Sequence, residues 1–196
     1  MNATRVTTEQ EAGAAAVLAD AFFHDPVVSW MYPNARKRRE RFRRMTARML
    51  ALTRDRNHVL RTDGNGACSY WMPPGEPPLT LGEQLRTVMP SIPALARRLP
   101  QTLALLDLMD RKHPKEPHWY LFLVGSDPAR RGQGHGIAVI RPVLEQCDRQ
   151  GTPAYLENSN PVNAALYERL GFVGSGELRR AGSPPLVPMW REPRTG

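Results

Sequence analysis

The stretch HWYLFLVGSDPARRGQGHGIAVI, residues 118–140, joins an apolar run to an amphipathic one through three alternating glycines and two arginines. The run HWYLFLV at its start predicts a strand that is buried on both faces. From Ile137 to Cys147 apolar residues recur at helical spacing, and this helix should end near Gly151. Because glycine loses the most backbone freedom on folding, glycines gathered between a strand and a helix indicate a geometric requirement, such as a ligand that contacts the backbone.

A glycine-rich turn at a helix N-terminus suits an anion, because it exposes several backbone N–H groups where the helix dipole also favours negative charge. Residues 130–136, RRGQGHG, therefore favour a pyrophosphate site, although a tight turn with solvated arginines has the same appearance. Two other phosphate motifs are excluded. No Lys-Ser or Lys-Thr pair follows the glycines, as a Walker A loop requires, and no acidic residue stands where a Rossmann fold contacts ribose.

The segments after this helix continue the alternation of strand and helix. Residues 153–157, PAYLE, predict a short strand, and residues 161–170, PVNAALYERL, predict a helix that begins behind Asn160 and ends at Gly171. A further strand begins in residues 172–176. The second half of the chain thus reads strand, glycine loop, helix, strand, helix, strand, which is a mixed α/β pattern.

The first half predicts two helices, a hairpin and an irregular segment. Helical spacing of apolar residues covers residues 9–23 and 34–52. Residues 57–73 predict a β-hairpin, because the Asp-Gly and Asn-Gly pairs of its turn supply the positive φ angles of tight turns. Residues 73–117 are rich in proline and contain short apolar helical pieces, which predicts a helical insertion on the sheet.

Length and charge limit the possible classes of protein. A chain of 196 residues with 41% hydrophobic residues fits one soluble globular domain over residues 1–196. The formal charge of +8 and the pI near 10.2 indicate an anionic partner, which nucleic acid, a membrane surface or a phosphorylated cofactor would satisfy. Most of this charge comes from residues 36–44, RKRRERFRR, which favour a solvated helix face; no RNA- or DNA-binding motif accompanies them.

Cysteine usage and the N-terminus indicate a cytoplasmic protein. Cys68 and Cys147 lie far apart without metal-ligand spacing, so we expect buried thiols, no disulfide and no metal site. Glu9, Glu11 and Asp20 interrupt the first apolar segment, unlike a signal peptide, and no apolar run is long enough to span a bilayer. Whether the protein is a monomer or a homodimer is left open by the sequence.

Two motifs resemble a known superfamily. Arg131, Gly134 and Gly136 fit the Arg/Gln-x-x-Gly-x-Gly/Ala signature of the GNAT superfamily of acetyl-CoA-dependent N-acetyltransferases, and NPVNAALYERLGF at residues 160–172 is similar to its second motif. HPKEPHWYLFLVGSDPARRGQGHG, PAYLENSNPVNAALYERLGF and, near the N-terminus, AFFHDPVVSWMYPN resemble the puromycin N-acetyltransferase branch. The resemblance implies an α/β GNAT fold: a central mixed, mostly antiparallel sheet flanked by helices, whose splayed strands hold acetyl-CoA.

The resemblance also implies where the cofactor lies. The backbone of Val124 to Ser126 would pair with the pantetheine arm, residues 132–137 would hold the pyrophosphate, Asn160 would bind the pantetheine region, and Tyr167 would stand near the thioester sulfur. Ser126 departs from the family pattern, which usually has an aliphatic residue there. The residues implied in cofactor binding are Val124, Gly125, Ser126, Arg131, Gly132, Gln133, Gly134, His135, Gly136, Ile137, Asn160, Asn163 and Tyr167.

Acetyl transfer to an amine requires a deprotonated amine, a polarised carbonyl and a proton for the departing thiolate. Tyrosine keeps its proton at neutral pH, which makes Tyr167 a candidate general acid; its alternative is a packing role beside Leu166 and Leu170. We expect the carbonyl to be polarised by a backbone N–H within residues 123–125, where a bulge would leave a donor unpaired.

The general base is not identified by the sequence. Tyr120 stands about where many family members have a carboxylate. A water chain to Glu157, Asp25 or His118 would replace it, and an amine that arrives neutral would need no base. Each candidate also has a structural interpretation: Glu157 as a surface charge at a strand end, Asp25 as a turn former before Pro26, and His118 as a solvated strand start.

The sequence therefore predicts an acetyl-CoA-dependent N-acetyltransferase that acetylates a primary amine of a small molecule, an antibiotic or a metabolite, by direct attack in a ternary complex. No cysteine motif indicates an acyl-enzyme. A protein or peptide N-acetyltransferase is the alternative that an open groove around residues 73–117 would favour. A non-catalytic acyl-CoA sensor and a basic nucleic-acid binder are alternatives of other classes.

Overall fold

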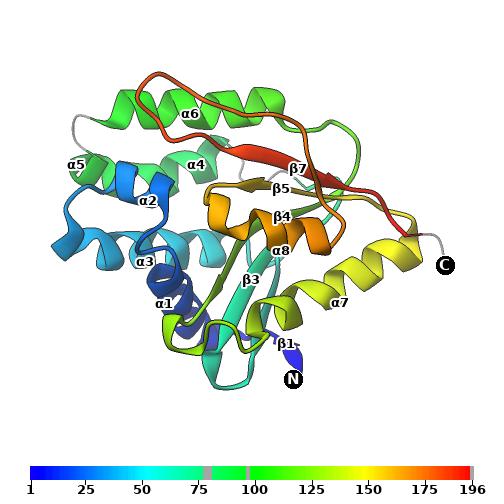
Figure 1. The fold of residues 1–196 in the computed structure, drawn as a ribbon. Coiled ribbons are helices and arrows are strands. Elements are labelled where there is room, and N and C mark those ends of the chain that lie inside the picture. Colours follow the sequence, from blue (N-terminus) through cyan, green and yellow to red (C-terminus); the bar gives the residue numbers. More distant parts are fainter. Residues whose placement is uncertain (77–80, 96–97, 195–196) are drawn as a thin grey trace.

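The computed structural model describes residues 1–76, 81–95 and 98–194, and the described strands form one seven-stranded sheet in the order β1-β2-β3-β4-β5-β7-β6 (Figure 1). Only β4 and β5 are parallel among these neighbours. The predicted mixed, mostly antiparallel sheet is thus confirmed. The strands are β1 (Ala3–Arg5), β2 (His58–Thr62), β3 (Ala67–Met72), β4 (Trp119–Ser126), β5 (Ala154–Asn158), β6 (Val173–Gly174) and β7 (Val187–Arg191).

The predicted hairpin is β2 and β3, which pair antiparallel. Its turn is a short 3-10 segment, Asp63–Asn65, in which Gly64 and Asn65 have φ of 60° and 54°. These are the positive angles that the Asp-Gly and Asn-Gly pairs supply at low cost. The sequence did not predict two of the strands, β1 and β7. The strand expected at residues 172–176 is only the two-residue β6.

Helices cover both faces of the sheet. The helices α1 (Glu11–Ala21) and α3 (Ala35–Leu52) pack on one face, where Leu18, Met49 and Tyr70 belong to one buried cluster. On the other face α7 (His135–Gln150) packs against β3 and β4, and its apolar residues join a second cluster. Both expected N-terminal helices are confirmed.

A further helix, α2 (Pro26–Met31), was not expected from the sequence. Asp25 caps it by accepting a hydrogen bond from the backbone N–H of Val28 at 3.0 Å. Pro26 at the first helical position is compatible with this cap, because that position needs no N–H donor. Asp25 is therefore a helix cap rather than a simple turn former.

The proline-rich segment contains three helices, α4 (Leu81–Val88), α5 (Ile92–Leu95) and α6 (Leu99–Lys112). The helical pieces predicted within residues 73–117 are therefore found; residues 77–80 and 96–97 of that segment lie outside the described residues. Figure 1 places α4, α5 and α6 beside α2 and α3.

The strands β4 and β5 pair only at their beginnings within the described structure, at Trp119 with Ala154 and Tyr120 with Tyr155. Beyond Tyr120 the partner of β4 is β3, and β4 turns away from β5 (Figure 1). The register against β3 shifts so that Phe122 is the bulged residue of β4, one position before the expected residues 123–125. Phe122, Leu123 and Val124 are only half-buried, so the expected burial of both faces holds only for the start of the strand.

After β5 the chain forms a short 3-10 segment, Pro161–Asn163, and then α8 (Ala164–Arg169). Asn160 caps the segment, accepting from the backbone N–H of Val162 at 3.2 Å, and Gly171 takes φ of 95° after the helix. Sequence analysis predicted both boundaries. Cys68 and Cys147 are free and buried, as expected. No helix in the described ranges has the length and apolar character to cross a membrane.

Candidate functional site

A cleft of about 430 Å³ opens between the diverging ends of β4 and β5. The turn before α7, the first turns of α7 and residues of α8 line it. Most residues implied in cofactor binding meet here. Those that line the cleft are Val124, Gly125, Ser126, Arg131, Gly132, Gly134, Gly136, Ile137, Asn160, Asn163 and Tyr167.

The glycine turn has the backbone shape of an anion site. Gly132 and Gly134 have φ of 77° and 84°, in the left-handed region that L side chains rarely adopt, and Gly134 is the N-cap of α7. Apart from the neighbouring residues of the chain and the backbone of α7, no described atom lies within 4 Å of the place a Cβ would take at either glycine. The helix N-terminus therefore faces free space, where its N–H groups and dipole favour a phosphate.

Gln133 and His135 do not line this cleft. The His135 side chain turns inward, is buried, and hydrogen-bonds through Nδ1 to Thr62 Oγ1 at 2.9 Å. A Cβ on Gly66 would lie 2.3 Å from the His135 ring, so this ring fills the space beside the hairpin turn. The side chain of His135 thus anchors the glycine turn to the β2–β3 turn, and only its backbone is left for a ligand.

A second cavity, of about 190 Å³, is also lined by Tyr167 and is mostly apolar. Helices α2, α3 and α6 line it together with β4 and β5, through side chains that include Met31, Met45, Leu105 and Met109. It shares five residues with the first cleft. The shared residues are Phe22, Asp25, Val124, Asn163 and Tyr167.

Tyr167 stands at this junction, where its ring packs against Phe172 with centroids 6.1 Å apart. The residue is 6% exposed. Burial, followed by the negative charge of Asp25, raises the pKa of Tyr167 above its ordinary value. The hydroxyl therefore keeps its proton at neutral pH and can deliver it to a thiolate.

Asp25 also stands at the junction, and both of its oxygens are engaged. Oδ1 accepts from the Val28 N–H, and Oδ2 accepts from the Ser159 hydroxyl at 2.5 Å. Burial raises the pKa of Asp25, although these hydrogen bonds act in the opposite direction. The geometry favours a structural role, in which Asp25 joins the start of α2 to the loop after β5.

Glu157 lines the apolar cavity and is buried, with a side chain that is 3% exposed. Its Oε2 accepts from the Tyr120 hydroxyl at 2.5 Å, and its Oε1 has no hydrogen-bond partner among the described residues. The interpretation as a surface charge is wrong. The structure also brings His113, at the end of α6, to 3.9 Å from this carboxylate. Sequence reasoning missed His113; its only signal was a histidine five residues before His118.

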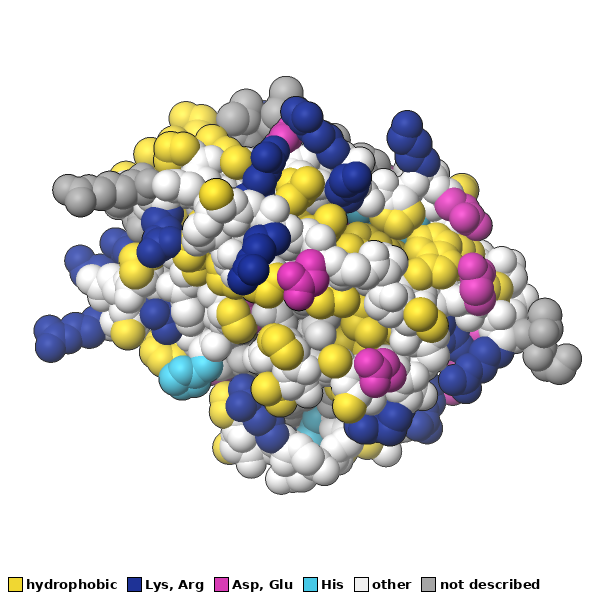
Figure 2. All heavy atoms as spheres, turned by 45° about the horizontal axis from the view of Figure 1, so that its top comes forward, with side chains coloured by type: hydrophobic (Ala, Val, Ile, Leu, Met, Phe, Trp, Pro, Cys, Tyr) yellow, Lys and Arg dark blue, Asp and Glu magenta, His cyan; other side chains and the backbone are white. Residues whose placement is uncertain are grey.

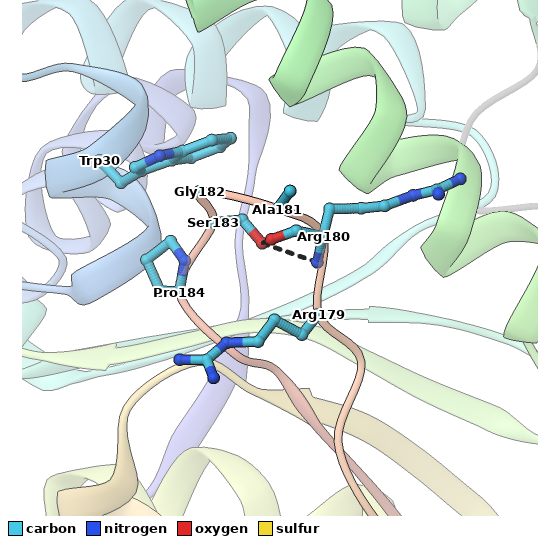
Figure 3. A pocket seen from close by; sticks show the side chains of 7 residues that line it. All are labelled: Trp30, Arg179, Arg180, Ala181, Gly182, Ser183 and Pro184. Atoms are coloured by element: carbon cyan, nitrogen blue, oxygen red, sulfur yellow. Dashed lines mark hydrogen bonds between the residues drawn. The ribbon is translucent and has the colours of Figure 1, made fainter.

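A third, open hollow of about 660 Å³ lies at the loop before β7 (Figure 3). Trp30 stands over it, and the side chains of Arg179 and Arg180 point in different directions. Ser183 Oγ accepts from the backbone N–H of Arg180 at 3.1 Å, which holds the loop together. Its lining residues include no carboxylate, histidine or tyrosine, so this hollow lacks the groups that acetyl transfer needs.

Comparisons with known proteins identify the class. Residues 99–172 match the model of the acetyltransferase (GNAT) family. Over its whole length the chain is 30% identical to an uncharacterised N-acetyltransferase of Schizosaccharomyces pombe, of which it covers 85%. The chain therefore belongs to the GNAT acetyltransferase family, and it is an acyltransferase whose acyl donor is acetyl-CoA.

Solved structures agree on the fold. A Corynebacterium glutamicum structure described as histone acetyltransferase HPA2 and related acetyltransferase superposes with a TM-score of 0.73 at 23% identity, covering 100% of this chain and 97% of that one. The NatC complex bound to a Gag peptide and CoA superposes with a TM-score of 0.54 at 11% identity, covering 99% and 100%. At these identities the likeness concerns the fold alone.

The cleft fits the phosphates and the pantetheine arm of the donor. The free edge of β4 beyond Tyr120 offers backbone groups to an extended amide chain, and the glycine turn offers helix N–H groups to phosphate. No group of three or more His, Cys, Asp or Glu side chains in the described part of the chain is arranged to hold a metal ion.

Proposed function

We propose that this protein transfers the acetyl group of acetyl-CoA to the primary amine of a small molecule. The observation that carries the proposal is the apolar cavity of about 190 Å³ that meets the cofactor cleft at Tyr167. Helices α2, α3 and α6 line this cavity together with β4 and β5, and such a mostly apolar hollow favours a small molecule as the acceptor. Its apolar walls favour an amine with an apolar body.

The role that we propose for each residue follows from its position in the site. Residues of the cleft, from the β4 edge through the glycine turn to Asn160 and Asn163, bind the donor. Tyr167 protonates the departing thiolate from the junction of the two cavities. The N–H groups of the bulged part of β4 polarise the thioester carbonyl.

The chemistry favours direct attack in a ternary complex. Burial raises the pKa of Cys68 and Cys147 to about 12, so neither thiol is ionised at neutral pH. A thiol that stays protonated and buried is a poor nucleophile. The acetyl group therefore passes from sulfur to nitrogen in one step, without an acyl-enzyme. Two buried, unpaired thiols also fit a reducing cytoplasm.

A protein or peptide acetyltransferase is the alternative that two of the structural relatives bring forward, since their descriptions name a histone acetyltransferase and a Gag peptide. The test is acetyl-CoA turnover against a library of primary amines, with puromycin because of the sequence resemblance, and against peptides with free N-termini. We expect turnover with apolar amines. Turnover with peptides alone would replace the proposal, and acetyl-CoA binding without any turnover would favour a sensor.

Two substitutions in α6 test whether the apolar cavity binds the acceptor. Met109→Trp fills the cavity and should lower kcat/KM about tenfold or more for bulky amines while leaving acetyl-CoA affinity unchanged. Leu103→Trp is the control, because Leu103 lies on the same helix and is 48% exposed. Equal effects of the two substitutions would contradict the assignment of the cavity to the acceptor.

A nucleic-acid-binding role has less support. Arginines of α3 form ion pairs within the protein: Arg39 with Asp20, and Arg43 and Arg44 with Glu40. Figure 2 shows Lys and Arg side chains spread over the visible face instead of gathered in one patch. A duplex would need a continuous basic surface.

A further inference from the structure

Two threonine side chains in the wall of the apolar cavity have hydroxyl groups without a partner. Thr87 on α4 and Thr102 on α6 line the cavity and are 3% and 1% exposed. The Oγ1 atom of each is buried and has no hydrogen-bond partner among the described residues. Neither residue lines the cofactor cleft, so both belong to the part of the wall that the cleft does not share.

A threonine in a helix ordinarily satisfies its hydroxyl group inside the protein, by bonding to a backbone carbonyl one turn earlier. Thr53, at the end of α3, does so: its hydroxyl donates to the carbonyl oxygen of Met49 at 2.8 Å. A buried hydroxyl without a partner is destabilising, and valine has almost the same shape and helix propensity without this cost. The hydroxyl groups of Thr87 and Thr102 are therefore available to a partner from outside the chain.

The position in the cavity wall is what distinguishes these two residues. Thr46 on α3 is 0% exposed, and its hydroxyl also lacks a partner among the described residues, but it does not line the cavity. Thr87 and Thr102 border space that a ligand can enter. Threonine in a helix has two χ1 rotamers, so a hydroxyl that no protein group holds can turn toward such a ligand.

Other polar groups of the cavity wall are engaged within the protein. The Ser159 hydroxyl donates to Asp25 at 2.5 Å, and the Tyr120 hydroxyl donates to Glu157 at 2.5 Å. A threonine hydroxyl can both donate and accept a hydrogen bond. Thr87 and Thr102 can thus bind a hydroxyl group as well as a carbonyl oxygen.

The charges around the cavity exclude an anionic group on the ligand. The described residues that line it include no Lys, Arg or His, and their ionisable acids are Asp25 and Glu157. A carboxylate or phosphate bound here would lose its hydration without gaining a cation, which is costly in an apolar site. The group that the threonines bind is therefore neutral.

We propose that the acceptor is an amine whose apolar body carries one hydroxyl or carbonyl group, and that Thr87 and Thr102 hydrogen-bond this group. The inference rests on the proposed function, because it places the acceptor in the apolar cavity. The amine lies toward Tyr167, where the cavity meets the cofactor cleft, and the polar group lies toward α4 and α6. An amine of the same shape without the group leaves the hydroxyls unpaired and is disfavoured. The two threonines determine specificity and take no part in the transfer.

The first experiment measures kcat/KM for pairs of amines that differ only in this group. One pair is 6-aminohexan-1-ol and heptylamine, in which a methyl group replaces the hydroxyl, and shorter and longer pairs cover the length of the cavity. We expect the amino alcohol of the best length to be preferred about tenfold. The matching amino acid, 6-aminohexanoate in this series, should react more slowly than either. No preference for the amino alcohol at any length would overturn the inference.

The second experiment repeats the best pair with three valine variants. Thr87→Val and Thr102→Val keep the shape of the wall, and each should lower the preference for the amino alcohol roughly fivefold by removing one hydrogen bond. Thr46→Val is the matched control, which removes an equally buried hydroxyl outside the cavity and should leave the preference unchanged. All three variants should be at least as stable as wild type in urea. A preference that neither cavity variant lowers would overturn the inference.

The third experiment does not depend on turnover. Calorimetry with the protein saturated with CoA, which carries no acetyl group, should show tighter binding of the amino alcohol than of its alkylamine, and Thr102→Val should reduce the difference. This binding preference without acetylation of any amine would overturn the proposed function and leave the recognition by the threonines. Acetylation of amines with equal binding of the pair would overturn the inference and leave the proposed function.

Discussion

The surroundings of Tyr167 determine the protonation state of its hydroxyl group. Its ring packs with Phe172, and burial raises its pKa, so its hydroxyl keeps its proton at neutral pH at the meeting point of two cavities. We expect Tyr167→Phe to lower kcat by a factor of about 10² to 10⁴, because it removes the proton and keeps the ring. Acetyl-CoA affinity, measured by calorimetry, should change little. A folded variant with the wild-type rate, chemistry being rate-limiting, would make Tyr167 a packing residue.

Asp25 provides a test of stability against pH. Its pKa is raised by burial above the ordinary value of 3.8, so the folded protein holds this proton more tightly than the unfolded chain. The stability that this group contributes is present below the unfolded pKa and is lost as the pH rises through the folded pKa. Asn at this position can still accept from Val28 and cannot ionise. The free energy of unfolding in urea should therefore increase for Asp25→Asn relative to wild type as the pH rises. A difference that does not change with pH would contradict a raised pKa for Asp25.

At the scale of elements, we propose that the turn before α7 carries the donor site. Gly134 at one end of α7 and Gly151 at the other both have positive φ, 84° and 62°, and both have open space around the missing Cβ. Alanine at either position should cost about 1–2 kcal/mol of stability through the same backbone strain. Only Gly134→Ala should also weaken acetyl-CoA binding, at least tenfold, because only that turn faces the phosphates. Calorimetry on both folded variants measures this, and equal affinities would remove the turn from the donor site.

At the scale of the whole molecule, the formal charge of +8 should assist binding of the phosphate-bearing donor. Acetyl-CoA affinity should decrease as ionic strength rises, because salt screens charges separated by more than about 8 Å at physiological strength. Arg131→Gln should flatten this salt dependence, since Arg131 lines the cleft. Arg44→Gln removes the same charge from the surface of α3, where it pairs with Glu40, and should leave the slope nearly unchanged. A flat profile for the wild type would exclude an electrostatic role.

Local sequence determined the elements of this protein, because strand, turn and helix signals act over a few residues. The alternation after residue 118, the hairpin turn at Gly64 and Asn65, the caps at Asn160 and Gly171, and the glycine turn before α7 all follow from backbone preferences. Short strands such as β1 and β7 have too little pattern to be found in this way. The role of Asp25 as the N-cap of α2 could not be predicted from the sequence, because an Asp-Pro pair is typical of turns and of helix starts alike.

Only the tertiary structure decided which side chains meet. The cavity beneath α6 exists because the proline-rich segment packs against α2 and α3, and the position of the bulge at Phe122 depends on pairing with β3. The side chain of His135 turns toward Thr62 because a glycine at position 66 leaves room for its ring. His113 reaches Glu157 across more than forty residues of chain. Such contacts depend on packing between distant segments, and no local preference encodes them.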